Sequence, residues 1–383
     1  MSSRLRFDRH ELAGALGDMG TYIPFLVGMV RECGLNPASA LLFSGLFNVV
    51  TGLTFGIPMA VQPMKAIGTI AIAEHLTVNE ILAAGLVTSA VIFGLGVTGL
   101  IEWVNRVVPF SVVRGLQLGL GLQLLINGID MVAKTGTAQW ADSIYIGLGC
   151  ALLILLLFFH RRVPGALVVF ALGLALVAVI APEVWRNVHL GLSLPPFTVP
   201  SLLDFETAAV RAAIPQIPLT TLNSVIAVCA LSWDLFPDRG VTPKRVATSV
   251  GLMNLVGCWF GAMPMCHGAG GLAGQHRFGA RTGGSVVALG LVKMLLGLTC
   301  GAAAFALMSV YPRSVLGTLL VFSGMELALV TSDVKVRTDA FVMLLTASVI
   351  LALKNTAVGF VIGLALAYLF LYGVLRIEPV DES

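Results

Sequence analysis

A glutamine and a lysine interrupt one of the most apolar stretches of this chain. Gln62, Met64 and Lys65 flank a proline within residues 37–73, a stretch that carries no other charged residue before its end. Proline blocks the continuation of a helix but suits the first turn of a new one, so free backbone N–H groups are expected at 64–66. A helix N-terminus attracts anions, and the Lys65 side chain adds a full positive charge. The spacing predicts an anion-binding site at these three residues. The alternative is that the Lys65 side chain extends (snorkels) to the membrane–water interface.

A second interruption, 206 positions further on, is rich in glycine. Cys266 and His267 stand directly before Gly268, Gly270 and Gly271. Glycine lets backbone N–H groups approach a ligand closely, so this turn predicts a second anion cradle. His267 can donate hydrogen bonds and titrate near neutral pH, and a packing role is its alternative. Cys266 alone offers no metal geometry, so neither a metal site nor a cofactor is predicted.

Further polar side chains lie in apolar segments elsewhere in the chain. Gln216, Thr220 and Asn223 fall within 11 residues of one another and are expected to line the site with amides and hydroxyls. Asp18 and Glu326 are candidates for carrying a coupling proton, because ionisable groups inside a membrane are usually functional. Anchoring of a helix end is the alternative for Asp18.

The composition predicts that these residues are held in a membrane protein. Hydrophobic residues make up 57% of the 383 positions and charged residues 11%, whereas soluble domains carry about 25% charge. Backbone in lipid must be satisfied within helices or closed barrels, and long apolar runs such as 163–180 lack the alternation of barrel strands. We therefore predict an all-α polytopic membrane protein surrounded by lipid. No catalytic residue, enzyme activity or nucleic-acid partner is expected.

The chain has room for about fourteen membrane segments of roughly 20 residues each. We predict them at 12–30, 37–54, 62–75, 79–102, 108–128, 142–159, 164–181, 208–236, 243–260, 267–278, 284–308, 313–331, 336–353 and 355–375. Segments three and ten are short and contain the two interruptions. With the N-terminus inside, fourteen of the 23 lysines and arginines, Arg161 and Arg162 among them, lie on the inner side and six on the outer side. Three others, Lys65, Arg114 and Lys293, lie within segments. The positive-inside rule then predicts that both termini are cytoplasmic.

The two interruptions belong to an internal repeat. Residues 37–68 align without a gap on 243–274, and eight of the 32 positions are identical. Seven segments separate the copies, and an odd number of crossings inverts the second copy. Inverted repeats with broken helices place a substrate site near the middle of the membrane. We predict a seven-plus-seven inverted repeat whose halves are residues 1–181 and 208–375.

Several strings resemble those of the molybdate transporter family, which is related to the sulfate permeases. They are Pro-Met-Ala-Val-Gln-Pro-Met-Lys at 58–65, Met-Pro-Met-Cys-His-Gly-Ala-Gly-Gly-Leu-Ala at 263–273, Phe-Gly-Ala-Arg-Thr-Gly at 278–283 and Gln-Ile-Pro-Leu-Thr-Thr-Leu-Asn-Ser at 216–224. Sulfate permeases usually end in a soluble regulatory domain, and this chain is expected to lack one. We therefore expect a bacterial-type member of the molybdate branch, in a bacterial inner membrane.

The resemblance implies a core domain, a gate domain and secondary active transport. The core would comprise 12–102 and 208–308, and the gate 108–181 and 313–375. The implied substrate is molybdate or sulfate, carried by alternating access, with a coupling proton or another ion and a homodimer as open options. The alternatives are a nucleobase:cation symporter of the same fold and an anion channel. A nucleobase symporter is expected to have a carboxylate at the second interruption to hydrogen-bond a neutral base, and this chain has His267 there.

Overall fold

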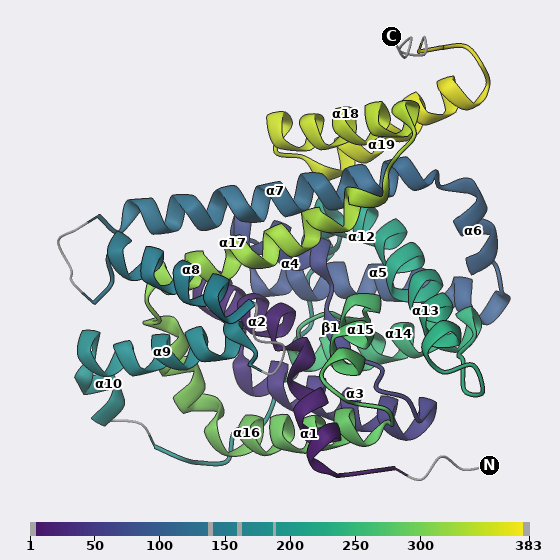
Figure 1. The fold of residues 1–383 in the computed structure, drawn as a ribbon. Helices are drawn as coiled ribbons and strands as arrows, with labels where there is room; N and C mark the ends of the chain where they lie inside the picture. The colour runs from purple at the N-terminus through teal and green to yellow at the C-terminus, as the bar shows by residue number, and fades with distance from the viewer. Residues whose placement is uncertain (1–4, 137–140, 159–162, 187–188, 378–383) are drawn as a thin grey trace.

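Helices make up most of the chain and surround one short pair of strands (Figure 1). The computed structural model describes residues 5–136, 141–158, 163–186 and 189–377. Within these ranges, seven helical stretches are long and apolar enough to cross a membrane, and three shorter helices are also apolar. The chain is therefore a multi-pass integral membrane protein, as predicted. Arg161 and Arg162, which were counted for the orientation, lie outside the described residues.

The first half contains segments one to seven. Its elements are α1 (Arg9–Ala15), α2 (Met19–Cys33), α3 (Pro37–Phe55), β1 (Val61–Pro63), α4 (Lys65–Glu74), α5 (Val78–Thr98), α6 (Ile101–Val107), α7 (Phe110–Lys134), α8 (Ile144–Phe158), α9 (Gly165–Ile180) and α10 (Pro182–Arg186). A 3-10 turn at Leu16–Asp18 joins α1 to α2 into one segment. The helix of segment five runs to Lys134, six residues beyond its predicted end at 128.

The second half repeats this order. Its elements are α11 (Leu202–Ala208), α12 (Ile214–Leu219), α13 (Ala227–Leu235), α14 (Pro243–Gly257), β2 (Met265–His267), α15 (Ala269–Arg277), α16 (Gly284–Ser309), α17 (Arg313–Leu329), α18 (Arg337–Leu353) and α19 (Thr356–Leu371). Two π-helical stretches, η2 (Ala209–Ala213) and η3 (Thr220–Ile226), connect α11 to α13 within segment eight. Pro215 and Pro218 lie inside this segment, and prolines of this kind disturb the regular hydrogen-bond ladder of a helix.

Both predicted interruptions form the same motif, a three-residue strand followed by a short helix. β1 leads into α4, and β2 leads into α15. The strands pair antiparallel, with Val61 opposite His267 and Pro63 opposite Met265. Within the described residues, two broken segments and twelve helical segments make up an all-α polytopic fold with a seven-plus-seven inverted repeat. The predicted fold class is confirmed, although the strand pairing itself was not predicted.

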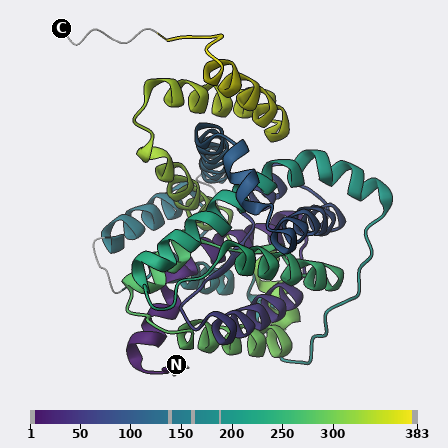
Figure 2. The ribbon, with the colours of Figure 1, turned by 90° about the vertical axis from the view of Figure 1, so that its right-hand side faces the viewer.

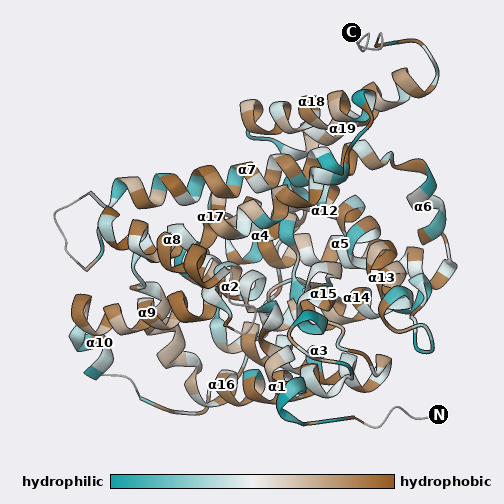
Figure 3. Ribbon diagram, viewed as in Figure 1, coloured by the Kyte–Doolittle hydropathy of each residue, from teal (hydrophilic) through white to brown (hydrophobic). Residues whose placement is uncertain are grey.

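Hydrogen bonds between distant loops agree with fourteen alternating crossings. Each of them joins segment ends that the predicted topology places on the same side of the membrane. They link Glu11 to the amides of Arg281 and Thr282, Arg211 to Glu74, Asp142 to the amides of Arg313 and Ser314, and Tyr368 to the carbonyl of Val107. Figure 3 shows hydrophobic residues along most of the helices and stretches of hydrophilic residues in α1 and α6.

Long helices of one half pack against long helices of the other half. α3 lies along α16, α5 along α14, and α7 along α17. Two of these contacts are reciprocal between glycines. A Cβ on Gly45 would lie 2.5 Å from the Gly290 carbonyl oxygen, and a Cβ on Gly290 would lie equally close to that of Gly45. Gly121 and Gly324 meet in the same way in the α7–α17 contact. Small residues let helix backbones approach closely in lipid, where no hydrophobic effect drives helices together.

The last two helices form a pair at the edge of the bundle. α18 packs on α7 and on α19. Figure 2 shows this yellow pair beyond the rest of the helices, and the opposite side of the molecule holds α3 and α16. The broken segments lie between these two regions, at the centre of the bundle (Figure 1).

Candidate functional site

A cavity of about 420 Å³ lies beside the two broken segments. Five predicted residues line it: Asp18, Gln62, Lys65, Gly270 and Glu326. They come from the first segment, β1, the start of α4, the first turn of α15, and α17. The opposite wall is apolar and consists largely of residues from α8, α9 and α17, including Ile154, Leu157, Ala166, Leu319 and Phe322.

Lys65 is the first residue of α4, and its side chain is only partly buried at the cavity wall. Among the described residues, no ion pair or hydrogen bond to its ammonium group is present. The antiparallel strand pair explains why Lys65 and Gly270 line the same cavity. Each strand ends directly before a helix, so the pairing brings the starts of α4 and α15 to one short ribbon.

Gln216 caps the N-terminus of α4. Its side-chain oxygen accepts hydrogen bonds from the amides of Ala66 at 2.8 Å and Ile67 at 3.2 Å, and its side-chain nitrogen donates to Thr220 Oγ1 at 2.8 Å. The Met64 amide donates to the carbonyl of Pro264 at 2.9 Å. The expectation that the amides of Met64 and Ala66 are free is therefore wrong in this structure. Buried amides require a partner, and neighbouring protein groups supply one for each.

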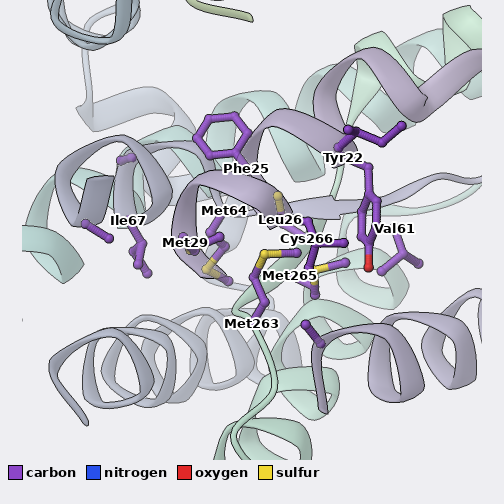
Figure 4. Close-up of a cluster of buried hydrophobic side chains, with 14 of the residues drawn as sticks. Tyr22, Phe25, Leu26, Met29, Val61, Met64, Ile67, Met263, Met265 and Cys266 are labelled. Carbon is purple, nitrogen blue, oxygen red and sulfur yellow. The ribbon is translucent and has the colours of Figure 1, made fainter. Parts of the chain in front are cut away.

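Four further predicted residues lie outside the cavity wall. Gln216 and Thr220 are buried in the cap of α4. Asn223 lies in η3 and is partly buried. The Met64 side chain points into an apolar cluster with Phe25 and Met29, where Figure 4 draws it. The structure brings these residues close to the broken segments but not to the surface of the cavity.

A buried hydrogen bond connects the first segment to β1. Gln62 Nε2 donates to Asp18 Oδ1, and both side chains are almost fully buried. Gly271 makes room for this pair, because a Cβ there would lie 2.6 Å from Gln62 Nε2 and 2.9 Å from Asp18 Oδ1. Gly268 likewise faces the Gln62 amide. Of the three glycines predicted to form a cradle, only Gly270 has open space around it.

His267 is fully buried, and both of its ring nitrogens have protein partners. Nδ1 lies 3.0 Å from the carbonyl oxygen of Ala60, and Nε2 lies 3.1 Å from Ser249 Oγ. Phe55 packs edge-on against the ring. The imidazole thus links three elements and does not line the cavity. This geometry gives no support to a direct contact between His267 and a substrate, and it fits the alternative packing role.

Two features of the site were not predicted from the sequence. Asn254 holds β2 in place, because its side-chain oxygen accepts from the Met265 amide at 2.6 Å and its nitrogen donates to the Met265 carbonyl at 2.7 Å. Its identity with Asn48 in the repeat was the available signal. Lys293, for which the sequence predicted only a place within segment eleven, is buried with its ammonium group 3.5 Å from the centre of the Tyr22 ring.

Cys266 has a hydrogen-bond partner within the protein. Its sulfur receives a hydrogen bond from Ser224 Oγ at 3.2 Å and is buried in the apolar cluster of Figure 4. Within the described part of the chain, no group of three or more His, Cys, Asp and Glu side chains is placed to hold a metal ion.

Comparison with known proteins identifies close relatives in plants. Molybdate transporter 2 of Arabidopsis thaliana is 43% identical, and the match covers 97% of this chain and 88% of that protein. Molybdate transporter 1 of the same plant is 39% identical over 92% of this chain and 86% of its own length.

Solved structures with little sequence identity share the fold. The transmembrane domain of a cyanobacterium bicarbonate transporter, BicA, has a TM-score of 0.66 at 14% identity, with 92% of this chain and 97% of that chain covered. The murine Solute Carrier 26 family member A9 anion transporter, in its inward-facing state, has a TM-score of 0.71 at 15% identity, covering 99% of this chain and 72% of that one.

Residues 10–124 and 208–327 match the family described as molybdate transporters of the MFS superfamily. MFS transporters are built from two halves of six segments, so the superfamily name in this description does not fit the seven-plus-seven arrangement seen here. The matched residues include both broken segments and most of the cavity wall. By this match, and by its identity with the plant relatives, the chain belongs to the molybdate transporter family.

Proposed function

We propose that this protein is a secondary active transporter of a tetrahedral oxyanion, with molybdate as the foremost substrate and sulfate as the second. Membership of a transporter family and an architecture shared with anion transporters support the coarser function, anion transport. The observation that carries the finer proposal is Lys65, whose ammonium group has no hydrogen bond or ion pair among the described residues, at a cavity beside the two broken segments.

Electrostatics favour an anion in this cavity. A dianion that leaves water loses a large hydration energy, and burial without compensating charge is prohibitive. Lys65 supplies one positive charge, and the starts of α4 and α15 add the partial charges of their helix dipoles. Gln62 and the exposed backbone at Gly270 add neutral hydrogen-bond donors at the same wall.

The cavity suggests which step of transport the structure represents. Arg277 and Phe278, at the end of segment ten, and Val163 and Pro164, before segment seven, line it. These positions lie on the side that the positive-inside rule assigns to the cytoplasm. We infer an inward-facing conformation, in which the apolar wall from α8, α9 and α17 belongs to the gate domain and the wall with Lys65 belongs to the core domain. Transport would exchange this opening for one on the other side.

The nucleobase:cation symporter remains the second candidate. The observation in its favour is the Asp18–Gln62 pair at the cavity wall, because a carboxylate and an amide could hydrogen-bond a neutral base. An anion channel is the third candidate. We place the protein in the inner or plasma membrane with both termini in the cytoplasm, and a homodimer is compatible with this arrangement.

Uptake by proteoliposomes tests the proposed function. Purified protein should take up labelled molybdate, tungstate should compete with it, and uracil should not. Sulfate competition then measures how far the site distinguishes the two oxyanions. Accumulation above the outside concentration under an imposed ion gradient would separate a transporter from a channel. Competition by uracil without competition by oxyanions would assign the site to nucleobases instead.

A further inference from the structure

A further cavity, of about 380 Å³, lies at the other end of α4 from Lys65, and we call it the outer cavity. Its wall comes from the end of α4, the second half of α7 and the end of α18. α7 packs against both α4 and α18 (Figure 1). The polar residues of the wall are Gln123, Asn127, Asp130 and Lys354.

In the predicted topology, the outer cavity lies on the opposite side of the membrane from the cavity at Lys65. α4, α7 and α18 all end at the outer cavity, and loop charge assigns these ends to the outside. Lys65 and Ala73 lie at the walls of the two cavities, about 12 Å apart along α4. Residues 66–72 between them are buried. Each end of α4 therefore borders a cavity, and packed helix separates the two.

The charge that remains unbalanced at the outer cavity is positive. Lys354 is exposed, and its ammonium group has no hydrogen bond or ion pair among the described residues. Asp130, the acid of the wall, lies 2.6 Å from Lys134 Nζ on the next turn of α7, so these two charges offset each other. Glu74, at the end of α4, is likewise paired with Arg211 at 2.6 Å. An anion in this cavity therefore meets the charge of Lys354.

The backbone of Lys354 is held in a conformation that lysine rarely adopts. Lys354 ends α18 with φ 48° and ψ 37°, in the left-handed region. Glycine takes this conformation at helix ends without a steric penalty, whereas a residue with a Cβ does not. Strained backbone of this kind occurs preferentially at functional sites. A lysine at a position that suits glycine indicates a use for its side chain, and that side chain lies at the cavity wall.

Two amides add neutral hydrogen-bonding groups to the same wall. Gln123 and Asn127 are one turn apart on α7 and therefore share a face of the helix. Neither side chain has a hydrogen-bond partner among the described residues, and Gln123 Oε1 is buried. Rotation about its last side-chain bond brings the Gln123 amide N–H groups to that position. α19 begins just beyond Lys354 and adds the positive end of its dipole.

We propose that the outer cavity binds the transported oxyanion from the outside, as a capture site that precedes the site at Lys65. Lys354 supplies the charge, and Gln123 and Asn127 supply hydrogen bonds. The inference rests on the proposed function, because its ligand is the transported anion. Binding at this site is weak, since Lys354 is exposed to water. Its main effect is on the rate of capture, as is typical of charges at the rim of a binding site.

Initial rates of molybdate uptake into right-side-out cells test the role of Lys354. Lys354→Gln should lower uptake at low molybdate concentration by about three- to tenfold and leave the rate at saturation unchanged. Lys354→Arg should restore the parent rate. Asp130→Asn should change uptake in the opposite direction, because it releases the charge of Lys134. Arg186→Gln, at an exposed residue of α10 on the same side of the membrane, is the matched control and should behave as the parent.

A glycine variant and added salt separate the charge of Lys354 from its structural role. Lys354→Gly removes the backbone strain together with the charge. It should raise the melting temperature and still lose uptake at low molybdate concentration. The difference between the parent and Lys354→Gln should shrink as ionic strength rises, because salt screens exposed charges. A gain in both stability and uptake for Lys354→Gly would show a structural role only and overturn the inference.

Protection of an introduced cysteine measures occupancy of the outer cavity directly. Ile126 lines the cavity and is 51% exposed, so Ile126→Cys should react with a membrane-impermeant thiol reagent added from outside. The parent, without this cysteine, gives the background from native thiols. Molybdate and tungstate should slow the labelling, and uracil should not. The protection should persist with Lys65→Gln and disappear with Lys354→Gln.

The possible results separate this inference from the proposed function. If the parent takes up no molybdate, the proposed function fails and the inference fails with it. If uptake is normal but Lys354→Gln matches the parent at low molybdate, or molybdate leaves the labelling of Ile126→Cys unchanged, the inference alone is overturned. Protection in lipid-free detergent but not in membranes would assign the cavity to a lipid phosphate, which also overturns it. Protection lost with Lys65→Gln would place the anion at the other cavity, with the same consequence.

Discussion

At the scale of single residues, Lys65 and Gln216 have different roles at the start of α4. The neutral Gln216 side chain occupies amides that a bound anion would otherwise use. The positive charge offered by this helix to the cavity therefore comes largely from the Lys65 side chain. Gln216, a predicted ligand, is not at the cavity wall because its side chain is engaged in capping α4.

Replacement of Lys65 tests directly whether its side chain supplies the positive charge at the cavity. We expect Lys65→Gln to weaken molybdate binding by about 2–5 kcal/mol, because the dianion loses its nearest cation in a desolvated site. Lys65→Arg keeps the charge but enlarges the group, so it should retain partial binding at most. Calorimetry on purified, folded variants provides the measurement. Binding by Lys65→Gln within about threefold of the parent would mean that another group, with Lys293 first in line, supplies the charge.

His267 should affect stability more than affinity. The sequence predicts that His267→Ala lowers transport, whereas the geometry indicates that any loss follows from destabilisation. The substitution leaves the Ala60 carbonyl and the Ser249 hydroxyl without their partner, at a cost of about 1–3 kcal/mol for each buried group left unpaired. We expect a lower melting temperature and a molybdate Kd close to that of the parent in the folded fraction. An unchanged melting temperature with a tenfold weaker Kd would instead make His267 a substrate ligand.

At the scale of elements, the first turn of α15 has two faces. Gly271 faces the Asp18–Gln62 hydrogen bond, and Gly270 faces open space at the cavity. Neither glycine is in a backbone conformation with positive φ. Their importance therefore comes from the space that a side chain would occupy.

A pair of alanine variants separates the two faces. Gly271→Ala should lower the melting temperature, because its methyl group would meet Ala60, Gln62 and Asp18 at 2.5 to 2.9 Å. Overpacking of this kind costs about 1–3 kcal/mol. Gly270→Ala should unfold at the parent temperature but bind molybdate more weakly, because its methyl group enters the cavity. Each variant serves as the control for the other. Equal effects on stability and binding in both would contradict the assignment of the two faces.

At the scale of the whole molecule, the predicted sidedness depends on charges in the loops. The bond from Arg114 Nε to Asp333 Oδ1, 2.9 Å long, joins the start of segment five to the end of segment twelve and agrees with an even number of crossings between these two ends. Contacts of this kind fix which ends share a side, but they do not state which side faces the cytoplasm.

Accessibility of tags at the two termini measures the absolute orientation. We expect tags at the N-terminus and at the C-terminus to be protected from added protease in right-side-out cells, and to be cleaved after the membrane is permeabilised. The reason is the excess of lysine and arginine on the side that holds both ends. Cleavage of either tag in intact cells would contradict the predicted orientation.

The sequence predicts the fold more completely than it predicts the cavity wall. Hydropathy, loop charge and the internal repeat are enough to predict fourteen segments and the positions of the two interruptions. The three-residue strands were missed, because each is defined by a partner about 200 positions away rather than by its own composition. The cap from Gln216 and the ring contacts of His267 were missed for the same reason. Residue type shows that a side chain can bind an anion, but only the packed structure shows that its atoms are already engaged.

The reciprocal glycine contacts have a consequence for the synthesis of the protein in the cell. Gly45 and Gly121 in the first half meet Gly290 and Gly324, which the ribosome adds more than 200 residues later. Segments can enter the bilayer one after another, but α3, α5 and α7 lack their partners until the second half has been inserted. Contacts between residues so distant in sequence form slowly. The first half must therefore remain in the membrane with its helix surfaces unpaired, and helix packing is completed only after most of the chain has been made.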